Sequence, residues 1–161
     1  MPRIDKEHYY LDIAETVSER STCLRRCYGA IIVKSDEVIA TGYNGAPRDR
    51  ANCADLGRCT RMDLNIPSGQ RYELCRSVHA EANCIISAAR NEMLGATLYM
   101  ACRDPADGAL IPGSTSCSMC RRLIINAGIA KVVIRDTPDG YRVVDVQKEW
   151  IDTDDSLPCS C

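Results

Sequence analysis

The pattern of apolar and polar residues changes along the chain between the periods of helices and strands. Residues 5–20 have apolar side chains four positions apart, which predicts a helix with one apolar stripe, formed by Tyr9, Ile13 and Val17. Residues 28–47 hold two β-rich stretches that flank a polar turn at residues 34–37. This part of the chain therefore predicts a helix followed by a hairpin.

The second half of the chain continues the alternation of helices and strands. Residues 77–92, SVHAEANCIISAARNE, begin with a capping-type serine and predict a helix, and ATLYMAC, residues 96–102, predicts a strand. CSMCRRLIINAGI predicts a helix that ends near Gly128, and two short strands then flank a TPDG turn. The order α-ββ-α-β-α-β-β predicts an α/β domain with helices packed on a central sheet.

Length, composition and charge narrow the class of protein. A chain of 161 residues with 45% apolar side chains predicts one domain, which we place at residues 1–146, followed by a loosely held tail at 147–161. The net charge of −2 offers no basic face for nucleic acid and favours a small-molecule partner. No stretch is apolar enough for a membrane span or a secretory signal, so we expect a cytoplasmic location.

The eleven cysteines suggest metal chemistry, because disulfides are rare in a reducing cytosol. Cys117 and Cys120 are three positions apart at a predicted helix start, where the helix dipole favours thiolates that face one point. With His79 they form a His/Cys/Cys set that leaves a fourth position open for water. That arrangement is typical of catalytic zinc.

Glu81 lies two residues after His79 and can take a proton from such a water and return it to a substrate. Alone, a Cys-x-x-Cys pair is often half of a structural zinc site or a redox pair, and a His-x-Glu pair is usually a solvated helix face. The two pairs in this order, on consecutive predicted helices, match the pattern of zinc-dependent nucleobase deaminases. Together they predict a catalytic zinc site.

Five segments of the chain resemble the cytidine and deoxycytidylate deaminase superfamily, and most of all its dCMP deaminases. In family order they are STCLRRCYGAIIV, ATGYNGAP, VHAEANCIISAA, GATLYM and CSMCRRLIINAGIAKVV. The resemblance implies a three-layer α/β/α cytidine deaminase-like fold with a mixed central sheet. It also implies zinc-dependent hydrolytic deamination of dCMP to dUMP with release of ammonia, which supplies dUMP for thymidylate synthesis. A homo-oligomer, commonly a hexamer, with dCTP and dTTP as effectors is implied as well.

The resemblance also implies roles for individual residues. His79, Cys117 and Cys120 would hold the zinc, and Glu81 would transfer the proton. Four further residues would bind substrate, among them Arg25 at the 5′-phosphate and Asn44 at the sugar, with contributions from Ala80 and Tyr141. Without the resemblance, Arg25 reads as a solvated arginine, and Tyr141 is equally well explained as an ordinary half-buried strand residue.

Some features depart from the family pattern and leave alternatives open. Ser116 replaces the usual proline before the cysteine pair, and the loop at residues 103–114 is longer than usual. The substrate could instead be free cytidine, guanine, a pyrimidine of riboflavin synthesis or a tRNA adenosine. A non-catalytic zinc-binding module is the other alternative, but it has no need of Glu81.

A second, structural zinc is predicted for the long connection at residues 46–76. Cys53, Cys59 and Cys75 lie in this irregular segment, and a metal would offset the entropy of ordering it. The resemblance supports this prediction, since some dCMP deaminases carry an additional zinc in the region. The fourth ligand stays open among a residue of a neighbouring subunit, His8, Cys102, Cys159 and Cys161. Ordinary, unligated cysteines are the alternative.

Overall fold

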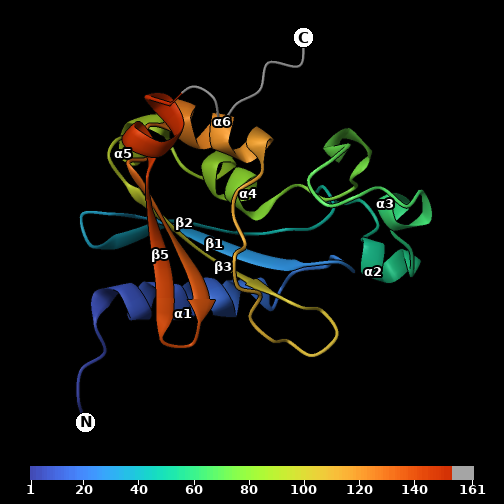
Figure 1. Ribbon diagram of the computed structural model, residues 1–161, viewed down its shortest axis with the longest axis horizontal. Coiled ribbons are helices and arrows are strands. Elements are labelled where there is room, and N and C mark those ends of the chain that lie inside the picture. The colour runs from blue at the N-terminus through green and yellow to red at the C-terminus, as the bar shows by residue number, and fades with distance from the viewer. Residues whose placement is uncertain (154–161) are drawn as a thin grey trace.

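The computed structural model describes residues 1–153 and has three layers (Figure 1). Helix α1 (Lys6–Ser18) covers one face of a five-stranded sheet. The opposite face is covered by α4 (Ala80–Ile86), α5 (Arg90–Met93) and α6 (Ser118–Ala127). The three-layer α/β/α fold expected from the sequence is therefore confirmed.

The sheet has the order β2-β1-β3-β4-β5. Its strands are β1 (Cys27–Lys34), β2 (Glu37–Tyr43), β3 (Thr97–Arg103), β4 (Lys131–Thr137) and β5 (Gly140–Asp145). Neighbouring strands are antiparallel except β3 and β4, which are parallel, so the sheet is mixed as expected.

Successive side chains of a strand point to opposite sides of the sheet, and helices cover both sides. The inner strands therefore bury side chains on both faces. On β1, Ile31 and Val33 join the apolar cluster under α1, whereas Ala30 and Ile32 join the larger cluster under α4 and α6. The inner strands consequently read as nearly continuous apolar runs, and each face needs its own layer of helix.

The strand directions place two helix starts at one edge of the sheet. Strands β2 and β3 are both antiparallel to β1, and hence parallel to each other. Helix α4 follows β2 in the chain, and α6 follows β3. Both helices therefore begin beside the same edge, where the carboxyl ends of β2 and β3 lie.

Most predicted elements are confirmed, with one clear error. Asp5 caps α1 by accepting a hydrogen bond from the backbone N–H of His8 at 2.9 Å. The single helix predicted at residues 77–92 is instead two helices, and α4 starts after an N-cap at His79. The chain just before it is extended, because Val78 forms a β-bridge with Gly45.

The ordered domain extends beyond its predicted boundary at residue 146. A short helical turn, η2 (Gln147–Ile151), follows β5, and its Trp150 is buried in the apolar cluster under α4 and α6. The tail predicted from residue 147 is therefore part of the packed domain at its start, and residues 154–161 lie outside the described part of the chain. Within residues 1–153, no helix has the length and apolar character needed to cross a membrane.

Candidate active site

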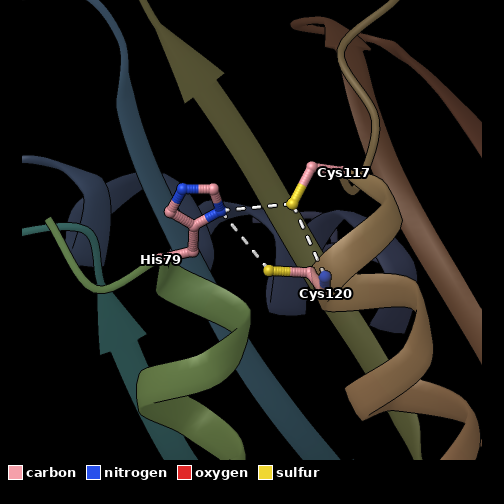
Figure 2. Close-up of side chains that lie close together, drawn as sticks. All are labelled: His79, Cys117 and Cys120. Atoms are coloured by element: carbon pink, nitrogen blue, oxygen red, sulfur yellow. Dashed lines mark hydrogen bonds between the residues drawn. The ribbon is translucent and has the colours of Figure 1, made fainter. Parts of the chain in front are cut away.

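Two helix starts bring three metal-binding side chains together (Figure 2). His79 is the N-cap residue of α4, Cys117 is the N-cap residue of α6, and Cys120 lies in the first turn of α6. The His79 Nδ1 atom is 3.4 Å from the Sγ atom of each cysteine. The ligand set predicted from the sequence is therefore assembled in space.

The spacing of these atoms fits a zinc ion. Tetrahedral zinc with the usual Zn–N and Zn–S bond lengths places nitrogen and sulfur ligands about 3.5 Å apart. Within residues 1–153, these three residues form the one group of three or more metal-binding side chains whose ligand atoms are this close together. Three protein ligands leave one coordination position for a further group, as at catalytic zinc sites.

The two cysteines differ in their proton affinity. A hydrogen bond with the Cys120 side chain, supported by His79, lowers the pKa of Cys117 to about 4. A lowered pKa favours the thiolate of Cys117, which is the form that binds metal. The same pairing raises the pKa of Cys120, so that metal binding would release a proton from this thiol.

Glu81 lies in the first turn of α4 and is only 4% exposed. Burial raises the pKa of its carboxyl group above the ordinary value. It lines the same pocket as His79 and Cys117. A buried carboxyl with a raised pKa beside a metal site is suited to accept and donate protons near neutral pH.

Gly42 on β2 allows α4 to approach the sheet closely, a role that sequence reasoning missed. A Cβ atom at this position would lie 2.4 Å from the Ala80 carbonyl oxygen and 2.7 Å from the Cys84 backbone nitrogen. The glycine in the ATGYNG segment was the available signal, since glycine permits such close backbone approach. Cys84 on α4 is fully buried, and its thiol donates to the Ala30 carbonyl oxygen at 3.1 Å.

The connection at residues 46–76 forms much of the pocket wall around His79. It contains the short helices α2 (Cys53–Leu56) and α3 (Thr60–Asp63) and the turn η1 (Tyr72–Leu74). The Tyr72 ring stands edge to face with the His79 ring, with 4.8 Å between centroids. Arg61 places its guanidinium 4.3 Å from the centre of the Tyr72 ring. The irregular sequence gave no signal for either residue.

Three of the four predicted substrate-binding residues line this pocket, namely Asn44, Ala80 and Arg25. The Asn44 amide accepts from the Tyr28 N–H at 2.8 Å and donates to the Arg26 carbonyl at 2.8 Å, which leaves one amide hydrogen. Tyr141 does not line this pocket, and its ring on β5 packs against His8 of α1.

The three cysteines predicted to hold a second zinc also line the pocket, as does Cys23. Among the described residues, however, their sulfurs do not form a group at ligand distance comparable to that at His79. Cys53 lies on α2, and Cys59 and Cys75 flank α3 and η1; within residues 1–153 they form no preformed second site. Of the alternatives for the fourth ligand, His8 is paired with Asp5 and Cys102 is fully buried in β3.

The family model for the cytidine and deoxycytidylate deaminase zinc-binding region matches residues 4–136. The chain belongs to this family. Among deaminases of the family, the deoxycytidylate deaminase of Mycobacterium phage D29 is 38% identical over 137 residues, covering 83% of this chain and 96% of the relative. That of Schizosaccharomyces pombe is 32% identical over 127 residues, and the match covers 79% of this chain but 36% of the relative.

A solved deaminase structure has the same fold. The dCMP deaminase of cyanophage S-TIM5, crystallised with dCMP and dUMP, is 26% identical and aligns with a TM-score of 0.57. The alignment covers 83% of this chain and 84% of the phage enzyme. Fold and family thus agree with the resemblance seen in the sequence.

Proposed function

We propose that this chain catalyses the hydrolytic deamination of dCMP, in which water is consumed and dUMP and ammonia are formed. The observation that carries this proposal is the His79, Cys117 and Cys120 group with buried Glu81 in the same pocket. The phage D29 and S. pombe relatives named deoxycytidylate deaminase, and the S-TIM5 structure with dCMP and dUMP, support this choice of substrate.

The residues of the pocket have separate tasks in this reaction. His79, Cys117 and Cys120 would hold a zinc ion, which when bound supplies Lewis-acid activation of water for attack on the base. Glu81 accepts the proton of the water and delivers it to the base, so that the amino group can leave as ammonia. Its burial keeps this proton away from bulk solvent.

The role of Glu81 is tested by Glu81→Gln. The amide keeps the shape of the side chain but cannot accept the proton, so we expect normal zinc content and folding with a loss of at least about 100-fold in kcat. Metal analysis and ammonia release measure the two effects. A zinc-loaded Glu81→Gln protein with the wild-type rate would contradict the assignment.

We also propose that the protein deaminates the nucleotide in preference to the nucleoside, because an arginine lines the pocket. Arg25 lines the pocket and would contact the 5′-phosphate, while Asn44 and Ala80 would contact the sugar and base. Ammonia release from dCMP, CMP, deoxycytidine and dCTP tests this proposal. Equal kcat/KM for dCMP and deoxycytidine would move the chain to the nucleoside deaminases.

A second zinc at Cys53, Cys59 and Cys75 stays a prediction, and Cys23 is the fourth ligand that the pocket offers. Burial and the charges of Cys59, Cys23 and Cys75 raise the pKa of Cys53, as expected for sulfurs gathered in one region. Metal binding would have to draw them closer. We expect about two zinc ions per chain, falling to about one in Cys59→Ser. One zinc ion in the wild-type protein would rule the second site out.

The oligomeric state, the effectors and the cytoplasmic location also stay predictions. The apolar side chains of Ile86, Met119 and Leu123 are exposed on α4 and α6, which is consistent with contact between subunits. Light scattering with and without dCTP or dTTP tests for a hexamer and for its response to nucleotides. A monomer with kinetics unaffected by either nucleotide would contradict both predictions.

A further inference from the structure

Arg61 is a strongly buried cation in the wall of the pocket. Its side chain is 5% exposed, and its Nε atom has no hydrogen-bond acceptor. The guanidinium donates to the Pro67 carbonyl oxygen at 3.0 Å, and it forms no ion pair with a carboxylate of residues 1–153. Burying an unpaired charge is costly, so this site calls for an anion.

The contrast with Arg135 shows that this chain pairs its other strongly buried arginine. Arg135 is 4% exposed, and its guanidinium contacts the carboxylates of Asp12, at 2.6 Å, and of Glu15. These contacts join β4 to α1 and neutralise the charge within the fold. The fold supplies Arg61 with one carbonyl and the face of Tyr72, and neither carries a negative charge.

Arg61 belongs to the same pocket as the metal-binding group. It lines the pocket together with His79 and Glu81. The centre of the Tyr72 ring is 4.3 Å from the Arg61 guanidinium carbon and 4.8 Å from the centre of the His79 imidazole. One aromatic ring therefore contacts both a predicted metal ligand and the cation, and all three side chains line the same pocket.

The other two arginines of the pocket are less deeply buried than Arg61. Arg25 donates to the Ile66 carbonyl oxygen at 3.4 Å. Arg26 is about half exposed and lies 3.8 Å from the carboxylate of Asp104. Arg61 combines the deepest burial of the three with the absence of a carboxylate partner among the described residues.

We propose that Arg61 binds the phosphate of the nucleotide substrate and thereby sets the preference for nucleotide over nucleoside. The proposal rests on the deaminase function given above and adds a residue to the one that the family resemblance places at the phosphate. The guanidinium offers several N–H donors for charge-assisted hydrogen bonds with phosphate oxygens. The free Nε donor would be satisfied in the complex, and the buried charge would gain its counterion.

The test compares Arg61→Met with Arg58→Met in zinc-loaded protein. Arg58 is the matched control, since it lies on the same segment but is exposed and paired with Asp63 at 2.9 Å. Arg61→Met should lower kcat/KM for dCMP by about 10- to 100-fold and leave deoxycytidine unchanged, because hydrogen bonds to a charged group are lost for the nucleotide alone. Calorimetry should show a similar loss of affinity for dUMP, while Arg58→Met matches the wild type in both assays.

Several outcomes would overturn the proposal. An equal loss for dCMP and deoxycytidine, or no loss for dCMP, would make Arg61 a structural residue. A zinc content below that of the wild type would show that Arg61 instead neutralises cysteine thiolates around a metal. If Arg61→Met fails to fold, Arg61→Lys tests the proposal instead, since lysine keeps the positive charge. Its kcat/KM should fall less than is expected for Arg61→Met, and only for dCMP. Equal losses for both substrates in Arg61→Lys would also overturn the proposal.

The same measurements separate this inference from the proposed function. Wild-type protein that binds dUMP but releases no ammonia from dCMP would contradict the deaminase function. The effect of Arg61→Met on dUMP affinity would still decide the role of Arg61.

Discussion

Gly42→Ala is expected to damage the active site through the backbone of α4. The added Cβ would lie 2.4 Å from the Ala80 carbonyl oxygen, where ordinary contact begins at 3.4 Å. The opposing atom belongs to the backbone, so no side-chain rotation can relieve the overlap, and α4 must move away from β2 by about 1 Å. The first turn of α4 carries Glu81 and begins at His79, so both groups would move with it.

The size of the effect follows from this displacement. Overpacking of this kind typically lowers the free energy of unfolding by about 1–3 kcal/mol. A misplacement of about 1 Å at a catalytic group can cost about 100-fold in rate. We therefore expect Gly42→Ala to fold with a lower melting temperature and to show about 100-fold lower kcat/KM for dCMP at saturating zinc.

Leu11→Ala provides the control from the opposite face of the sheet. Leu11 is fully buried in the cluster under α1, so its truncation should cost about 2–5 kcal/mol of stability without moving α4. Ammonia release is measured well below both melting temperatures, so that each variant is folded. Wild-type kcat/KM in Gly42→Ala, or an equal loss of activity in Leu11→Ala, would refute the reasoning.

Two further predictions concern residues away from the pocket. Tyr141→Phe should change kcat/KM for dCMP by less than about twofold in the ammonia assay, because Tyr141 packs against His8. Arg142 lowers the pKa of Asp136, so this carboxylate stabilises the fold above its unfolded pKa of 3.8, and the stabilisation is lost as pH falls through the folded value. Asp136→Asn should thus lower the urea midpoint at pH 7, and its difference from the wild type should shrink as the pH falls below 3.8.

The sequence predicted those features of the fold and site that depend on the residue types at one place in the chain. The hairpin of β1 and β2 turns at Ser35 and Asp36, which adopt left-handed φ values of 50° and 66° in the predicted polar turn. Helix α6 ends where Gly128 adopts a left-handed φ of 79°, as predicted from its glycine. The ligands His79, Cys117 and Cys120 were predictable because their chemistry depends on residue type and on position at helix starts.

The sequence did not predict features that depend on contacts between distant parts of the chain. It also missed a helix end where a side chain hydrogen-bonds the helix backbone. Residues 77–92 contain no glycine or proline, yet α4 ends at Ser87, whose hydroxyl donates to the Asn83 carbonyl oxygen at 2.8 Å. The predicted tail includes Trp150, whereas the Trp150 side chain is buried in the apolar cluster under α4 and α6. The burial of Arg61 has no periodic signal, since α3 is a single turn within an irregular segment.

The topology separates the residues that carry the chemistry from those that would select the substrate. His79 and Cys117 are 38 positions apart in the chain, and they meet because β2 and β3 run parallel and each leads to a helix on the same face. The connection between β2 and α4 must cross that same edge, so it forms part of the pocket wall beside His79. Changes in this connection, including Arg61, can alter nucleotide binding without moving the helix starts. Substitutions at Arg61 and Glu81 should accordingly have different effects. The first should lower the affinity for the phosphate of the nucleotide, and the second should lower kcat.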